Sequence, residues 1–318
     1  MMKLLQAFFL LFALFALWLV QPAAADYKQA VAYYGQGQYE KAIQEIKSDM
    51  DKNPDWEVGH RLLGLCYLGL KNNALAVSSL SRAVQLKSPA FSTYYGLGLA
   101  YFNMQRYDDS INALNQGESK ATEKEKGKLY KLRGSAYYRM NRYGDAADDL
   151  AASIRSGQAD WSDYSMLGVC HLNQNRTDEA IQTLEKALSM KPGENSISNA
   201  LGKAYFKRGV AALSSKQYGP TVQALTKARD YDPKNGYIYY NLAEAYLFEK
   251  RYAEAEKALN QALELMPKSL EVYARMGLVY EKQKKWDLAL NAYKKANEIS
   301  PSKAMKDAIA RVTENKKQ

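Results

Sequence analysis

Residues 242–267 read LAEAYLFEKRYAEAEKALNQALELMP. Within this stretch, small and large apolar residues recur three or four positions apart, which is the period of an α-helix with one buried face. Polar residues separate two such runs, and Pro267 stops the second one because proline cannot continue a helix. The stretch therefore predicts a hairpin of two α-helices.

The same pattern recurs along most of the chain. We define repeat position 0 as the residue before the acidic-plus-alanine segment, which is Tyr252 in the stretch above. Its equivalents are spaced by 34, 34, 36, 34, 41, 34 and 34 residues. They are Tyr39, Asn73, Tyr107, Tyr143, Thr177, Tyr218, Tyr252 and Trp286. Because one hairpin cannot bury both of its faces, the spacing predicts eight hairpins that stack on one another.

Other repeat positions have the same phase. Position −9 is always Gly or Ala, position +3 is always small, and position +7 is always a large apolar residue or Tyr. Position −6 is Tyr in six of the eight repeats, which explains much of the excess of 25 Tyr. We expect the small residue at −9 to let the second helix approach closely.

These residues resemble the tetratricopeptide repeat (TPR), with the closest matches at Leu63-Gly64…Tyr67, Leu97-Gly98…Tyr101 and Leu167-Gly168…His171. The resemblance covers residues 26–301. It implies an all-α, right-handed superhelical solenoid of about eight helical hairpins, whose first helices line a concave groove. Residues 302–318 are expected to form a C-terminal capping helix and tail, since the last hairpin of an array otherwise exposes its apolar side.

Two irregularities interrupt the period. Extra residues lie near 117–127, where Thr122 followed by Glu125 predicts a capping box that starts the fourth hairpin early. A seven-residue insertion lies near 203–216. Seven residues are about two helical turns, so we expect the first helix of the sixth hairpin to lengthen by ~10 Å without rotating its buried face.

The first 25 residues have the pattern of a secretory signal peptide. Lys3 is the only charge before Asp26, Leu4 to Val20 are apolar apart from Gln6, and Ala23 and Ala25 form an A-x-A site. We expect cleavage after Ala25 and export to the periplasm or another extracytoplasmic space. The alternative is an uncleaved inner-membrane anchor with the body facing outward, because this apolar run just reaches the length needed to span a bilayer.

The amino-acid composition gives little support for a catalytic function. The chain has two Cys and two His, and all four fall on predicted packing positions of first helices. Acid pairs such as Asp148-Asp149 are expected at a helix start or on a solvated face. We therefore expect no catalytic residue, no metal site and no cofactor, and the protein is predicted not to be an enzyme.

The formal charge of +10 does not predict a nucleic-acid partner. Basic residues occur in every repeat, with the densest clusters at Lys124–Lys131 and Lys282–Lys285, and no aromatic-interleaved basic strip is present. The export pattern also argues against nucleic acid. Membrane contact is expected only through an uncleaved signal or through a partner.

The predicted functional site is the groove. Between the Gly and Tyr positions of the first helices lie side chains expected to face it, apolar and aromatic in the first repeats and cationic in the middle. They are Tyr34, Arg61, Leu65, Leu68, Tyr95, Leu99, Phe102, Lys131, Tyr138, Arg139, Lys203 and Lys207. The alternative is that some of them pack on neighbouring repeats. Cytosolic TPR proteins that grip a C-terminal carboxylate have Lys and Asn one turn apart, and that clamp is missing here, since Ser135 follows Lys131.

These observations favour an exported, non-catalytic scaffold or adaptor that binds a partner protein or peptide segment with apolar anchors and acidic residues. Cell-envelope, secretion, pilus or polysaccharide machinery is the expected setting. The alternative is a regulatory or substrate-presenting subunit of an exported enzyme complex.

Overall fold

The computed structural model describes residues 25–317 and confirms the all-α repeat fold. The described residues contain no strand. The signal-peptide prediction falls almost wholly on residues outside this range. No helix among the residues described has both the length and the apolar character needed to cross a bilayer.

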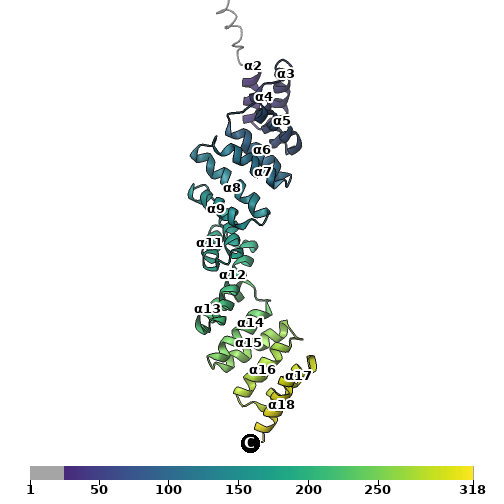
Figure 1. Ribbon diagram of the computed structural model, residues 1–318, viewed down its shortest axis with the longest axis vertical. Helices are drawn as coiled ribbons and strands as arrows, with labels where there is room; N and C mark the ends of the chain where they lie inside the picture. Colours follow the sequence, from purple (N-terminus) through teal and green to yellow (C-terminus); the bar gives the residue numbers. More distant parts are fainter. Residues whose placement is uncertain (1–24, 318) are drawn as a thin grey trace, which may run out of the picture. The chain divides into compact units, whose positions relative to one another are not determined.

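The helices alternate between first and second members of hairpins (Figure 1). The first helices are α2 (Ala25–Gly35), α4 (Glu57–Gly69), α6 (Phe91–Asn103), α8 (Glu123–Arg139), α10 (Trp161–Asn173), α12 (Asn195–Ser214), α14 (Gly236–Phe248) and α16 (Leu270–Lys282). The second helices are α3 (Tyr39–Met50), α5 (Asn73–Gln85), α7 (Tyr107–Glu118), α9 (Tyr143–Arg155), α11 (Thr177–Met190), α13 (Tyr218–Tyr231), α15 (Tyr252–Leu265) and α17 (Trp286–Ile299). A further helix, α18 (Lys303–Asn315), follows the last hairpin.

Contacts divide the chain into two units with four hairpins each. Unit 1 contains α2 to α9 and ends at Gln158, and unit 2 begins at Ala159 and contains α10 to α18. Within each unit, every first helix packs most extensively on the second helix of its own hairpin, and that second helix packs on the next first helix. Each unit is therefore a stack in which neighbours in sequence are neighbours in space.

The repeat positions explain why the hairpins close. Repeat position 0 is the first residue of every second helix, and the residues at +3 are completely buried in all eight hairpins. In the six repeats with glycine at −9, this glycine faces the large residue at +7. A Cβ atom added to Gly98 would lie 2.7 Å from Leu114 Cγ, and one added to Gly168 would lie 2.6 Å from Leu184 Cγ. These positions hold glycine because a side chain would collide with the second helix.

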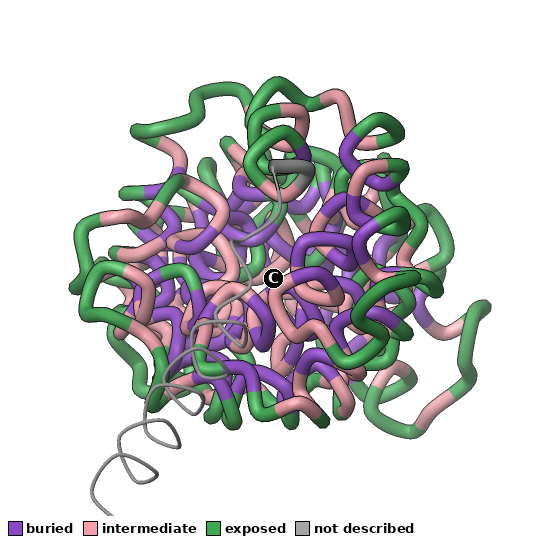
Figure 2. Tube along the Cα trace, turned by 90° about the horizontal axis from the view of Figure 1, so that it is seen from above, coloured by how far each residue is buried: buried purple, intermediate pink, exposed green. Residues whose placement is uncertain are grey.

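The turn inside each hairpin has one geometry. Position −2 has a positive φ in all eight hairpins and is glycine only at Gly37. The others are Lys71, Gln105, Asn141, Asn175, Lys216, Lys250 and Lys284, with φ between 58° and 63°. All eight of these turn residues are exposed. Figure 2 colours the trace by burial and shows that buried, half-buried and exposed residues alternate along it.

Both irregularities have a structural counterpart. Thr122 and Glu125 form the capping box, with Thr122 N donating to Glu125 Oε2 at 2.9 Å, and α8 has 17 residues. The seven-residue insertion corresponds to α12, which has 20 residues where α10 and α14 have 13.

Candidate functional site

First helices form a continuous face within each unit. Successive first helices contact each other directly, namely α2 with α4, α4 with α6 and α6 with α8 in unit 1, and α10 with α12, α12 with α14 and α14 with α16 in unit 2. No successive second helices of the described chain have comparable contact. The first helices therefore line the tighter, inner wall of each stack.

The face of unit 1 brings together most of the predicted site residues. All but one of them are half-buried, and Arg139 is exposed. They are Tyr34 on α2, Arg61, Leu65 and Leu68 on α4, Tyr95, Leu99 and Phe102 on α6, and Lys131, Tyr138 and Arg139 on α8. We call this set the unit 1 face. Half-burial means that each side chain both packs on its neighbours and retains accessible surface.

Close packing between α4 and α6 shapes the apolar part of the unit 1 face. A Cβ atom added to Gly96 would lie 3.1 Å from Leu65 Cδ2 and 3.3 Å from Leu68 Cδ1. Both leucines therefore lean onto α6, as the alternative interpretation of the sequence anticipated. The missing side chain at Gly96 lets the two first helices approach.

Aromatic residues at position −5 pack against the aromatic residue at position 0 of the same hairpin. The ring centroids of Tyr34 and Tyr39 are 5.8 Å apart, and those of Phe102 and Tyr107 are 5.5 Å apart. Tyr138 and Tyr143 repeat the arrangement at 6.1 Å. Such edge and tilted contacts fix the orientation of each ring, so the rings present rigid apolar surface.

Helix α6 provides an uncharged, aromatic centre. It has no charged residue, and Phe91 and Tyr95 pack with their ring centroids 5.5 Å apart. Burial raises the pKa of the Tyr95 hydroxyl, and the nearby positive charge of Lys131 partly offsets this rise. The aromatic surface of α6 thus borders the cationic surface of α8.

Two predicted groove cations are engaged elsewhere. Lys207 Nζ lies 3.2 Å from the backbone oxygen of Leu172 and 2.5 Å from Asn175 Oδ1, so it braces the turn of the preceding hairpin. Arg61 lies 3.6 Å from Glu57 on its own helix. Lys203 is exposed on α12. Of these three cations, Lys203 is exposed, and Arg61 and Lys207 are half-buried.

A recurring role for Arg at position −1 was missed from the sequence. Arg142 lies over the Tyr137 ring at 4.5 Å, and its Nε donates to Asp145 Oδ2 at 2.9 Å. The same arrangement occurs at Arg106 and Arg251. The signal was present as Tyr at −6, Arg at −1 and an acid at +2. Much of the positive charge at the turns is therefore structural.

The expectation that Asp149 lies on a solvated face is wrong. Asp149 is buried and accepts two hydrogen bonds from Arg133, at 2.7 and 2.9 Å. Arg133 also bonds Glu118 at 2.7 Å, so one guanidinium joins α7, α8 and α9. Burial disfavours the ionised forms of Asp149 and Glu118. The bonds from Arg133 and Tyr130 nevertheless hold the pKa of Glu118 below its ordinary value. No repeated sequence pattern marks this cluster, because Arg133 and Asp149 occupy positions −10 and +6, where most other repeats have an apolar or a small residue.

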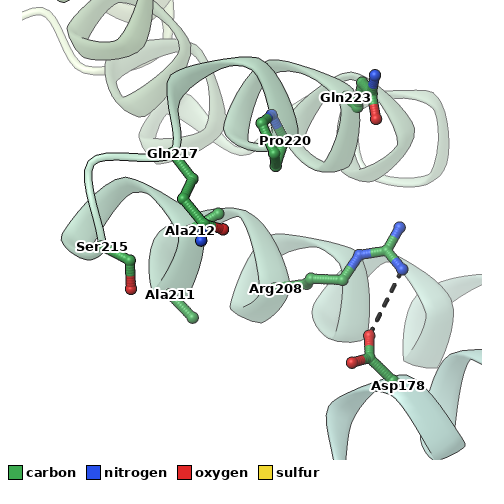
Figure 3. A pocket seen from close by; sticks show the side chains of 8 residues that line it. All are labelled: Asp178, Arg208, Ala211, Ala212, Ser215, Gln217, Pro220 and Gln223. Atoms are coloured by element: carbon green, nitrogen blue, oxygen red, sulfur yellow. Dashed lines mark ion pairs between the residues drawn. The ribbon is translucent and has the colours of Figure 1, made fainter.

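The lengthened α12 leaves a depression of about 490 Å³ in unit 2 (Figure 3). It is lined by Asp178, Arg208, Ala211, Ala212, Ser215, Gln217, Pro220 and Gln223. Because α12 continues for two extra turns, α13 begins ~10 Å further along it than in a regular hairpin. Asp178 and Arg208 pair at 3.6 Å at one edge, which leaves the lining with no net charge.

A second depression of unit 2, of about 450 Å³, lies where α14, α16 and α18 meet. Its cations have partners within the unit. Arg275 pairs with Glu244 at 2.6 Å, and Arg311 pairs with Glu281 at 2.9 Å. The cations of this depression are therefore neutralised within the unit.

The cysteines and histidines lie in packing positions. Cys66 and Cys170 are completely buried, and burial raises their thiol pKa values to about 11 and about 12. His171 is buried, which lowers its pKa together with the charge of Arg176. His60 Nε2 lies 2.8 Å from the Pro54 carbonyl oxygen. Among the residues described, no three His, Cys, Asp or Glu side chains are grouped to hold a metal ion.

Comparison with known families gives four models described as tetratricopeptide repeat. They match residues 24–48, 91–119, 131–195, 212–276 and 249–312. These ranges include hairpins from both units.

Individual relatives are distant. Hsp70-Hsp90 organizing protein 2 of Arabidopsis thaliana is 18% identical over 215 residues, which cover 65% of this chain and 35% of that protein. The chain thus spans about a third of the length of this relative. A solved C-terminal part of a TPR repeat-containing protein from Cytophaga hutchinsonii is 14% identical, covers 89% of this chain and 99% of that one, and has a TM-score of 0.50. The first TPR of Spaghetti (RPAP3), solved with an HSP90 peptide, is 22% identical and covers 38% and 96%, with a TM-score of 0.37.

Proposed function

Because the chain belongs to the tetratricopeptide repeat family, we propose that it is a non-catalytic scaffold that binds a segment of a partner protein on the first-helix face of unit 1. The observation that carries this proposal is the partly accessible apolar surface that runs from α4 to α6. It is bordered by the exposed cations of α8. Rigid aromatic residues beside Arg are the side chains that contribute most binding energy in protein interfaces.

The scaffold acts outside the cytoplasm in this proposal. Its support is the amino-terminal sequence, in which Lys3, the apolar run 4–20 and the A-x-A site at 23–25 have the order of a secretory signal. We propose an envelope-associated partner on the same basis. The mass of the protein recovered from the envelope of its source tests export: a mass without residues 1–25 supports it, and an intact chain in the cytosolic fraction contradicts it.

Site-specific photo-cross-linking tests the binding face. A benzophenone amino acid replaces Lys128 or Arg139, both exposed on α8, in the full chain within its native source. Matched controls carry it at Lys257 on α15 or Lys294 on α17, which are also exposed and form no salt bridge within the described chain. We expect one partner protein to cross-link at both α8 positions and at neither control. Equal cross-linking at all four positions, or none at α8, contradicts the proposal.

A further inference from the structure

Helix α8 has a cationic stripe that forms no ion pair with the part of the chain that the structure describes. Lys124, Lys128 and Arg139 are exposed, and none forms a salt bridge among the residues described. Each residue of an α-helix advances by about 100°, so these three side chains and Lys131 fall within an arc of ~80°. We call Lys124, Lys128 and Arg139 the α8 stripe.

The acidic residues next to the α8 stripe on the same helix, Glu123 and Glu125, form hydrogen bonds with other residues. Glu125 accepts hydrogen bonds from the backbone and hydroxyl of Thr122 at 2.9 and 2.7 Å, which leaves only weak attraction to Lys128. Glu123 bonds Lys126 at 2.6 Å. The stripe thus differs from Arg275 and Arg311 in unit 2, whose charges are balanced by Glu244 and Glu281.

The α8 stripe borders the apolar centre of the unit 1 face. Lys131, within the same arc, lies near enough to Tyr95 of α6 for its charge to act on the tyrosine hydroxyl. Helices α6 and α8 contact each other, and packed helices have axes 8 to ~10 Å apart. An extended peptide rises by about 3.3 Å per residue. Two of its side chains, one in contact with α6 and the other with α8, are therefore about three residues apart.

We propose that the unit 1 face selects an acidic segment of a partner protein, bound in an extended conformation with an aromatic or branched aliphatic anchor on α6 and Asp or Glu side chains about three residues away on the α8 stripe. Charge complementarity carries this inference. The stripe has unneutralised positive charge, and the adjoining helix α6 has no charge at all. The inference rests on the proposed function and adds the chemistry of the bound segment and the spacing between its anchor and its acidic residues.

Selection from a random peptide library tests the proposed chemistry. A displayed library of 12-residue peptides is selected against the purified full chain, against Lys124→Glu/Lys128→Glu, and against a control with Lys257→Glu/Lys294→Glu. Both double variants change the net charge equally. All four lysines are exposed and on helices, and circular dichroism verifies that the variants fold.

We expect the full chain to enrich peptides with an aromatic or aliphatic residue about three positions from Asp or Glu. The Kd of the most enriched peptide is then measured by fluorescence anisotropy. Compared with the unsubstituted chain, we expect the Kd to be at least about tenfold higher for the α8 double variant and unchanged within about twofold for the control variant. The difference should shrink as salt is raised, because exposed charges are screened.

Three outcomes overturn the inference, and they are distinguishable. Enrichment of apolar peptides that bind the α8 double variant equally well refutes the acidic chemistry but leaves the proposed function standing. Enrichment of no peptide by the full chain refutes both. Tight binding of single-stranded DNA or anionic lipid vesicles with the same dependence on Lys124 and Lys128, and without need for an anchor, shows that the stripe binds polyanions instead.

Discussion

Position −2 of each hairpin requires a left-handed backbone conformation. Seven of the eight hairpins supply it with a residue other than glycine, such as Lys250 with φ of 61°. The conformation completes the cap of the first helix, in which Lys250 N donates to the Leu247 oxygen at 3.0 Å and Arg251 N to the Tyr246 oxygen at 2.9 Å. A side chain with a Cβ atom is strained there by roughly 1–2 kcal/mol.

Replacing Lys250 with Gly is therefore expected to stabilise the protein. Relief of the strain outweighs the greater entropy of glycine in the unfolded chain, so we expect a net gain of about 0.5–1 kcal/mol. The midpoint of chemical denaturation measures it. The matched control, Lys257→Gly inside α15, should cost about 1 kcal/mol, since glycine is a poor helix former. Destabilisation by both substitutions would show that the turn does not strain Lys250.

Helix α18 is attached to unit 2 by packing and by a charged clamp. Ala308 and Val312 are buried against the unit 2 core. Arg311 bonds Glu281 of α16 through two hydrogen bonds of 2.9 and 3.0 Å, and Tyr293 of α17 donates to the same carboxylate at 3.1 Å. The bonds from Arg311 lower the pKa of Glu281 despite partial burial.

This shift predicts an acid-sensitive attachment. A carboxylate with a lowered pKa contributes stability above its unfolded-state pKa of about 4.3, and loses it as the pH falls through the folded value. Because Arg311 is half-exposed, we expect Glu281→Gln to cost only about 1 kcal/mol at pH 7, and the difference from the original chain to shrink as the pH falls below the unfolded-state pKa of about 4.3. Chemical denaturation of the two proteins at pH 7 and at pH 3.5 measures the cost and its change with pH.

Glu298→Gln is the control for this experiment. Glu298 pairs with Lys295 at 2.7 Å on the surface of α17, with both side chains at least 60% exposed. Screening by water makes such a pair nearly neutral, so little change is expected at either pH. A cost for Glu281→Gln that does not shrink between pH 7 and pH 3.5 would attribute its effect to packing rather than charge.

At the scale of the whole molecule, stability is a sum of hairpins and their nearest-neighbour interfaces. In each unit a hairpin contacts only those beside it in sequence. A local change should therefore have a local effect, unlike in a globular domain with a single core.

Deleting residues 302–318 tests this locality. Without α18, the apolar side of the last hairpin faces water, so amide hydrogen exchange should accelerate in α16 and α17. Exchange in α10 and α11, at the other end of unit 2, should remain unchanged. Hydrogen exchange with mass spectrometry resolves the segments. Uniform acceleration throughout unit 2 would show that it unfolds as one cooperative block.

The sequence by itself determined the hairpins and their buried positions. Each small residue at −9 or +3 and each large one at +7 acts within one hairpin or on the next, so a fixed spacing records it. The insertion at α12 and the capping box at Thr122 were predictable for the same reason, because they depend on neighbouring residues along one helix.

Only the tertiary structure decided which charges are available. Lys207 and Lys128 look alike in the sequence, yet one braces the turn of the preceding hairpin and the other is exposed on α8. Asp149 is buried against Arg133 of the other helix in its hairpin, and Arg133 also bonds Glu118 of the preceding hairpin. Such pairings depend on how helices stack and on where side chains extend between them, and no periodic pattern specifies either.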